Sequence, residues 1–233
     1  MQYDLLSVDR DAKTKKGKRW GYLTGALFLA PAKEADGIHD LCPGRSEECT
    51  DCCIYRTGNA EIYPHIADAR VAKTLQYLEN FDAFVQRLQW DTDKLVRDAE
   101  NRGLKPAERL NATSDQAKLA RVMAKRNPKM PFYDYTKLDR PWERVLENYH
   151  LTYSFNGHNE RQCFSAWAHG INVAVVFRGG LPKTWKGVPV IDGDKNDLRF
   201  LDPAAPVVVG LKEKGRRIRQ LPVGGFVQIG RAA

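Results

Sequence analysis

The chain has 233 residues, of which 42% are hydrophobic, and a net charge of +8. This length suits one large domain, and the hydrophobic fraction is too high for a disordered protein. No apolar run approaches the roughly 20 residues that a membrane-spanning helix needs, and the N-terminal sequence lacks the basic and apolar regions of a signal peptide. We therefore expect one domain over residues 1–233, located in the reducing cytoplasm, with no membrane partner.

The positive charge is concentrated in two short segments, at 11–20 and 211–220. Each has five basic residues and one acidic residue, so each carries +4 and together they account for the whole excess. Their basic residues include Lys13, Lys15, Lys16, Lys18, Arg19, Lys212, Lys214, Arg216 and Arg217. Locally dense positive charge suits binding to nucleic acid, because binding releases counterions. Two solvated basic loops are the alternative.

The first part of the chain predicts one buried strand, a long loop and two helices. The strand ends at Pro31, where a run of aromatic and apolar residues stops. Pro64 suits the first turn of a helix, and Gly103 is placed to end the second one. The expected elements are a strand at 20–30, a loop at 31–63, and helices at about 64–78 and 81–96.

Strands and helices then alternate with short connections. The expected strands are 105–111, 131–136, 149–155 and 171–177, and the expected helices are 114–126, one that opens at Pro141, and 161–169. This alternation predicts a parallel sheet built from β/α units. After Gly179 the strand patterns at 188–191, 206–210 and 225–229 have no full helices between them. We expect an α/β fold, a parallel (β/α) barrel or partial barrel with a β-rich C-terminal part over 180–233.

Four of the five cysteines fall within twelve residues of the predicted loop. They are Cys42, Cys49, Cys52 and Cys53, whereas Cys163 is far away in the sequence. Thiolates this close together can converge on one metal ion or iron–sulfur cluster. A redox disulfide and plain reduced thiols are the alternatives. The lack of a signal peptide and of other cysteine-rich sequence weighs against the disulfide.

Polar residues follow the carboxyl ends of the predicted strands, where β/α folds place their functional groups. These ends read Asn111-Ala-Thr-Ser-Asp115, Asp134-Tyr-Thr-Lys137 and Thr152-Tyr-Ser154-Phe-Asn156, with His158 just beyond. We expect the side chains to line one rim of the sheet. Structural alternatives remain: Ser114 or Asp115 can cap the next helix, Asp134 can pair with Lys137, and His158 can be an ordinary loop residue.

Several stretches together resemble a family of tailed-phage and prophage proteins, the gene product 88 group. They are Leu-Ala-Pro-Ala, the Cys-Pro loop, Arg-Leu-Asn-x-Thr-Ser-Asp, Phe-Tyr-Asp-Tyr-Thr-Lys, Tyr-His-Leu-Thr and Val-Ile-Asp-Gly-Asp. The resemblance covers most of the chain and implies a phage-encoded protein in the cytoplasm of the host. It indicates origin and not activity.

The order of the predicted parts also resembles radical S-adenosylmethionine enzymes, in which a three-cysteine loop follows the first strand and a polar turn follows the second. The resemblance implies that Cys42, Cys49 and Cys53 bind a [4Fe–4S] cluster, with Cys52 as a substitute or bystander. It also implies that S-adenosylmethionine binds beside residues 111–115. The spacing departs from the usual Cys-x₃-Cys-x₂-Cys, because six residues separate the first two cysteines and a Cys-Cys pair follows.

A second resemblance is to queuine-type guanine transglycosylases, which include phage enzymes that insert 7-deazaguanines into DNA. It implies a barrel with zinc, and Asp115 and Asp134 as the nucleophile and the base-recognising residue. The Ser-Gly-x-Phe loop of that group is missing here, and its zinc cysteines come late in the chain.

Three functions therefore stay open. The leading one is a phage-encoded iron–sulfur enzyme that acts on a nucleotide or nucleic-acid base. Its expected catalytic residues are Asp115, Asp134, Lys137 and His158, and its expected cofactor-binding residues are Asn111, Thr113, Ser114, Ser154 and Asn156. The second is a zinc-supported base-exchange enzyme. The third is a non-catalytic nucleic-acid-binding protein whose cysteines hold structural zinc.

Overall fold

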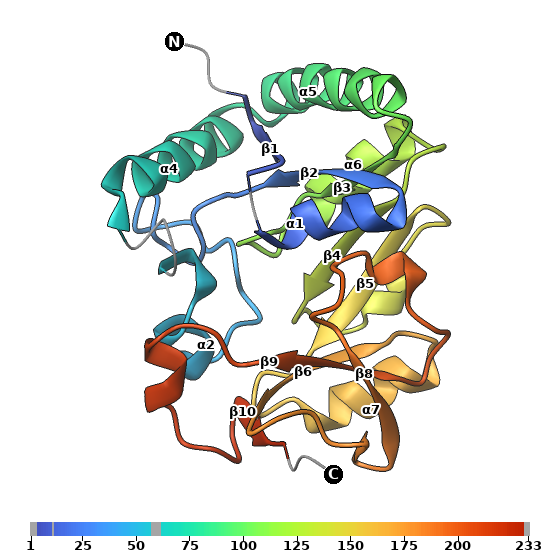
Figure 1. Cartoon of the computed structure of the whole chain (residues 1–233). Helices are drawn as coiled ribbons and strands as arrows, with labels where there is room; N and C mark the ends of the chain where they lie inside the picture. Colours follow the sequence, from blue (N-terminus) through green and yellow to red (C-terminus); the bar gives the residue numbers. More distant parts are fainter. Residues whose placement is uncertain (1–3, 11, 57–61, 231–233) are drawn as a thin grey trace.

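The structure, a computed structural model, describes residues 4–10, 12–56 and 62–230. These residues form a sheet of ten strands in the order β1-β2-β3-β4-β5-β6-β9-β8-β7, with β10 paired to β6 (Figure 1). The strands are β1 Leu6–Val8, β2 Tyr22–Leu27, β3 Lys105–Arg109, β4 Phe132–Thr136, β5 Tyr149–Ser154, β6 Val173–Arg178, β7 Thr184–Trp185, β8 Val188–Asp192, β9 Val208–Lys212 and β10 Val227–Ile229. Only β1 with β2 and β7 with β8 pair in an antiparallel manner.

Among the described residues, four longer helices and two short ones surround the sheet. They are α1 Ala12–Lys16, α2 Glu47–Asp51, α4 Pro64–Glu79, α5 Phe81–Asn101, α6 Ala117–Arg126 and α7 Glu160–Ala168. Single 3-10 turns lie at Gly17–Trp20, Ile54–Arg56, Pro141–Glu143, Arg199–Leu201 and Arg217–Gln220. Figure 1 shows α4 and α5 at the top of the molecule and α7 at the bottom.

The predicted mixture of parallel strands and helices is confirmed, but a closed barrel is not. Within the described part of the chain the sheet is open, with β1 at one edge and β7 at the other. The C-terminal strands β8, β9 and β10 belong to this same sheet. The helix expected at Pro141 is wrong: only the turn Pro141–Glu143 forms, because β5 begins at Tyr149 and leaves too little chain for a helix.

Side-chain alternation along each strand decides which residues reach which face of the sheet. On β4, Phe132 packs into the core beneath α5 and α6, whereas Tyr133 points to the other face and packs on Leu198 and Phe200. Asp134 shares the face of Phe132, and Tyr135 shares the face of Tyr133. Both faces of the central strands are therefore covered, as is usual for parallel sheets.

Candidate functional site

A cavity of about 220 Å³ lies where the carboxyl ends of β3, β4, β5 and β9 meet the cysteine-bearing loop. The parallel strands bring their carboxyl ends to one edge, which is why residues far apart in the sequence share this wall. The cavity wall includes these predicted site residues: Cys42, Cys49, Cys52, Cys53, Asn111, Thr113, Ser114, Asp115, Lys137, Ser154, Lys212 and Lys214.

Hydrogen bonds fasten the cysteine loop to the turn that follows β3. The carbonyl of Leu41 accepts from the amide of Asp115 at 2.8 Å and from Nε2 of Gln116 at 3.1 Å. The thiol of Cys42 lies 3.7 Å from the carbonyl of Thr113, to which it donates. The loop is thus held to the residues 111–116 by contacts that span about seventy positions of sequence.

Gly44 lets the loop approach the end of β4. A Cβ atom at this position would lie 2.7 Å from the carbonyl carbon and oxygen of Lys137, closer than any side chain tolerates. The carbonyl of Gly44 also accepts a hydrogen bond from Nδ2 of Asn156 at 3.3 Å. The loop therefore contacts the ends of three neighbouring strands, β3, β4 and β5.

Replacing Gly44 with Ala is expected to displace the loop, because the added methyl group meets backbone atoms that cannot rotate away. We expect a loss of about 1–3 kcal/mol in the free energy of unfolding and faster reaction of Cys42 with a thiol reagent. Gly225→Ala is the matched control, since its Cβ would meet only Oε1 of Glu48 at an ordinary 3.5 Å. Equal stability and thiol reactivity of the two variants would contradict this role of Gly44.

The other three cysteines lie on or next to the short helix α2. Ser46 caps this helix, and its hydroxyl accepts from the amide of Cys49 at 3.3 Å. Cys52 forms the C-cap of the helix and packs in an apolar cluster with Ile218 and Phe226 of the C-terminal segment. The cap thus fixes where Cys49 sits, and apolar packing fixes Cys52.

None of the five cysteines forms a disulfide in the structure. Burial raises the pKa of Cys42 to about 12, and the nearby charges of Asp115 and Cys53 add to the effect. Burial likewise raises the pKa of Cys52 to about 12. These two groups are protonated at neutral pH, so a metal that binds them must release protons.

Lys137 and Asp115 both line the cavity wall and are in contact. The amide of Lys137 donates to Oδ2 of Asp115 at 2.8 Å. Burial lowers the pKa of Lys137, but the electrostatic interactions of its ammonium with Cys49, Asp115 and Cys42 outweigh this and raise the pKa above its ordinary value. Burial raises the pKa of Asp115, against the opposing influence of Lys137. The wall therefore combines a lysine that stays charged, a carboxyl group and thiols.

Asp134 does not reach the cavity, because it points to the helix-covered face of β4. Its oxygens accept from the amide of Asn111 at 2.7 Å, from Nδ2 of Asn111 at 2.9 Å and from the hydroxyl of Tyr149 at 3.2 Å. Burial raises the pKa of Asp134 to about 7 despite these bonds. Asn111 in turn accepts from Ser114 at 3.0 Å and from the amide of Gln116 at 2.6 Å. Asp134 thus holds the turn that follows β3, and it does not pair with Lys137.

His158 and Asn156 also lie outside the cavity wall. The His158 side chain is 68% exposed, and its Nε2 lies 3.1 Å from Oε1 of Glu48 on α2. Nδ2 of Asn156 donates to the carbonyl of Gly44, and Oδ1 of Asn156 accepts a hydrogen bond from the amide of His158 at 3.0 Å. The structure thus places both residues where they support the loops around the cavity.

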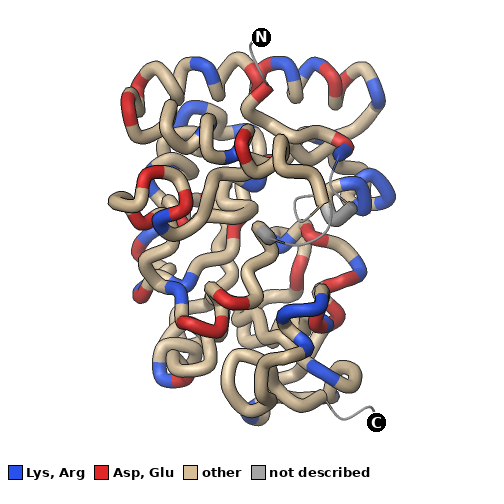
Figure 2. Tube along the Cα trace, turned by 90° about the vertical axis from the view of Figure 1, so that its left-hand side faces the viewer, with Lys and Arg blue, Asp and Glu red and all other residues tan. Residues whose placement is uncertain are grey.

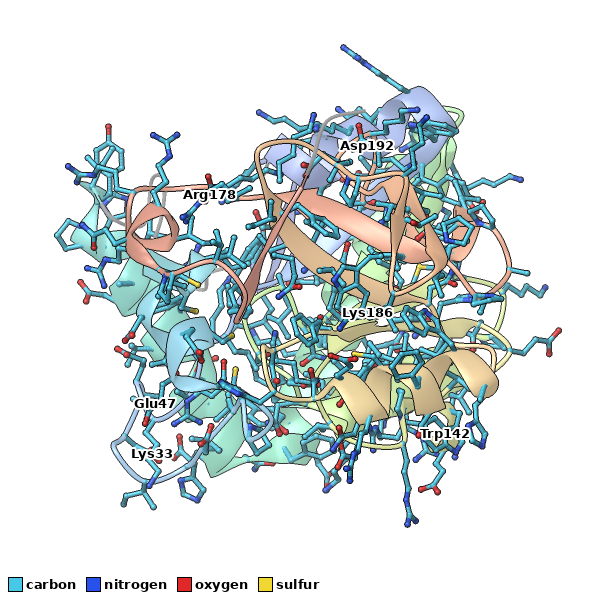
Figure 3. The ribbon with its side chains drawn as sticks, turned by 90° about the horizontal axis from the view of Figure 1, so that it is seen from below. Lys33, Glu47, Trp142, Arg178, Lys186 and Asp192 are labelled. Atoms are coloured by element: carbon cyan, nitrogen blue, oxygen red, sulfur yellow. The ribbon has the colours of Figure 1, made fainter. Side chains whose placement is uncertain are left out.

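The C-terminal segment forms a wall that the sequence did not predict. Ile218 and Phe226 line the cavity from this side. Arg178 holds the segment in place, since its guanidinium donates to Glu213 at 2.8 Å and to the carbonyls of Ile218 at 2.8 Å and Leu221 at 3.2 Å. Figure 3 shows Arg178 beside this segment, in red, above the light-blue segment that carries Glu47. Arg45, Arg109, Tyr135 and Phe155 also line the wall.

The basic residues divide between the cavity and the surface around it. Lys212 and Lys214 line the cavity, whereas Lys15, Lys16, Lys18, Arg19, Arg216 and Arg217 are exposed outside it. The side chain of Lys13 lies outside the described part of the chain. Among the residues that the structure describes, no three His, Cys, Asp or Glu side chains are arranged to hold a metal ion. No described helix is long and apolar enough to span a membrane.

The fold and the site together define an α/β protein with a mostly parallel sheet. Cysteines line a cavity at the carboxyl ends of its strands. A family model described as gene product 88 matches residues 4–223, so the chain belongs to the gene product 88 family. This confirms the resemblance to that group and is consistent with a phage origin. No curated protein and no solved structure matches the chain, so the resemblances to radical S-adenosylmethionine enzymes and to transglycosylases gain no support from these comparisons.

Proposed function

We propose that this protein is an enzyme in which Cys42, Cys49 and Cys53 bind an iron–sulfur cluster beside a substrate that carries a nucleotide or nucleic-acid base. One observation carries the proposal: four cysteines that form no disulfide and the polar residues 111–115 line the same cavity. Thiolates are the ligands of iron–sulfur clusters, and a cavity with convergent polar groups is the usual form of an enzyme site.

The choice of three ligands follows from burial. Cys52 is only 5% exposed and packs against Ile218 and Phe226, so it serves the apolar contact with the C-terminal segment. Cys42, Cys49 and Cys53 are each partly exposed. No described set of three is already arranged around one point, so cluster binding would require the side chains of Cys42, Cys49 and Cys53 to change position. An iron without a cysteine ligand would accept S-adenosylmethionine, with residues 111–115 alongside.

The other polar groups of the cavity wall are suited to contact the substrate. Lys137 keeps its positive charge and suits an anionic group, and Asp115 can accept or donate a proton within the cavity. Ser154 adds a hydroxyl from the end of β5. The zinc-supported base exchanger has less support, because Asp134, its base-recognising residue, faces the core and not the cavity.

Single Cys→Ala variants test the proposal. The protein is purified without oxygen and supplied with iron and sulfide, and absorbance at about 400 nm is measured. Cys42→Ala, Cys49→Ala and Cys53→Ala are expected to lose most of this absorbance. Cys163→Ala is the control, because Cys163 lies on α7 and is buried in a separate core cluster, away from the cysteine loop. Absorbance that survives in all three loop variants would contradict the ligand assignment.

Asp115→Asn separates an enzyme from a non-catalytic binder. In an enzyme this variant is expected to lose turnover while it retains the absorbance at about 400 nm. In a protein that only binds nucleic acid, the same change leaves affinity for an oligonucleotide nearly unchanged.

A further inference from the structure

The two basic segments, which lie at opposite ends of the sequence, meet at Asp194. Nζ of Lys16 donates to the carbonyl of Asp194 at 2.6 Å. From the other segment, the ammonium of Lys214 pairs with Oδ1 of Asp194, and the amide of Lys212 donates to its Oδ2 at 3.0 Å. One acidic residue thus joins two clusters of positive charge into a single surface, which we call the basic surface.

The basic surface retains free positive charge after its internal ion pairs are counted. Lys18 pairs with Asp9 at 2.6 Å, and Lys214 pairs with Asp194. The exposed residues of the two segments without an acidic partner among the described residues include Lys15, Arg19, Lys212, Arg217 and Arg219. Figure 2 shows stretches of Lys and Arg on the right-hand side of the molecule, at mid-height and below.

This surface leads into the cavity, because Lys212 and Lys214 belong to both. The cavity, at about 220 Å³, is smaller than the roughly 300–1,000 Å³ of pockets that enclose drug-sized ligands. Its wall offers the aromatic rings of Tyr135, Phe155 and Phe226 next to polar groups. Aromatic rings stack on bases, and a base inside a duplex cannot enter a recessed pocket unless it leaves the stack.

We propose that the partner of the basic surface is a single-stranded nucleic acid, whose phosphates lie along the two basic segments while one base enters the cavity. Single-stranded nucleic acid is then the substrate class of the cavity. The reaction at the bound base rests on the proposed function, whereas binding of the strand does not. A polymer suits the surface better than a free nucleotide, because the unpartnered cations extend well beyond the cavity wall.

Fluorescence anisotropy with a labelled single-stranded oligonucleotide tests the proposal. The variant replaces Lys15, Arg19, Lys212 and Arg217 with Gln. Its matched control replaces Lys118, Lys125, Arg126 and Lys129 with Gln, which are exposed and lie on or just after α6, on the face of the sheet that α5 covers. We expect the variant to lose at least about tenfold in affinity and to show a shallower salt dependence. The control should stay within about twofold of the wild type.

Three results would overturn the proposal: equal losses in the variant and its control, duplex that binds as tightly as single strand, or binding to anionic lipid vesicles without binding to the oligonucleotide. Tight binding of a mononucleotide alone would also overturn it. The double variant Cys42→Ala/Cys53→Ala separates the two proposals. If this variant still binds the oligonucleotide but holds no iron, oligonucleotide binding by the basic surface does not depend on the cluster.

Discussion

Replacing Glu108 with Gln is expected to flatten the dependence of stability on pH between about pH 5 and pH 8. Glu108 is completely buried on β3, and the polar group nearest its carboxyl oxygens is the hydroxyl of Thr92, which donates to the carbonyl of Leu88. Burial raises its pKa from 4.5 to about 8. The carboxyl group is therefore neutral in the folded protein at pH 7, where the unfolded chain has lost the proton.

The sign follows from the proton count. Between pH 4.5 and about 8 the unfolded state binds fewer protons at this site than the folded state, so stability falls as pH rises. The slope is about 1.4 kcal/mol per pH unit for one proton. Below this window the penalty is absent, and above it the penalty is complete. Asp134, with a pKa near 7, contributes with the same sign.

Urea unfolding of wild type and Glu108→Gln at several pH values measures the effect. The quantity compared is the slope of the free energy of unfolding against pH. The absolute free energy of unfolding is not compared, because burying the Gln amide has a free-energy cost of its own. Glu143→Gln is the control, since the Glu143 side chain is 54% exposed. A Glu108→Gln protein with the wild-type slope would show that Glu108 is ionised in the fold or reached by water.

The largest loss of stability is expected from Arg109→Met. The Arg109 guanidinium lies 2.6 Å from Asp197, and the two side chains are only 8% and 5% exposed. The change leaves a buried carboxylate without the Arg109 cation, which typically costs about 3–5 kcal/mol. Asp197 belongs to the segment that leads to the turn Arg199–Leu201, which covers β4 and β5.

The double variant Arg109→Met/Asp197→Leu is expected to recover much of this loss, because both charges leave the interior together. Urea unfolding of the two single variants and the double variant gives the coupling energy. The exposed pair Arg140 and Glu143, 3.5 Å apart, should show less than about 1 kcal/mol by the same cycle. A double variant as unstable as the sum of its singles would contradict the account.

The sequence was sufficient to predict most of the elements, since apolar periodicity and breakers such as Pro64 mark them directly. It also placed the cysteine loop beside residues 111–115, because parallel strands deliver their carboxyl ends to one edge. The strands β1 and β7 and the helices α1 and α2 were missed. They have three, two, five and five residues, too few to show a clear period.

Asp134 shows why the site was only partly predictable. On β4 aromatic residues occupy both faces, Phe132 on one and Tyr133 and Tyr135 on the other, so the pattern does not reveal which face holds the cavity. The alternation places Asp134 in the core and Lys137 in the wall. The wall formed by Ile218 and Phe226 depends on contacts across the whole chain, which leave no local signal.

Iron and acid-labile sulfide content of the wild-type protein, prepared without oxygen, tests the central claim most directly. The account predicts iron and sulfide in about equal amounts, near four of each per chain for a [4Fe–4S] cluster. Protein that takes up no iron under these conditions, or that holds one tightly bound zinc ion per chain instead, would contradict it.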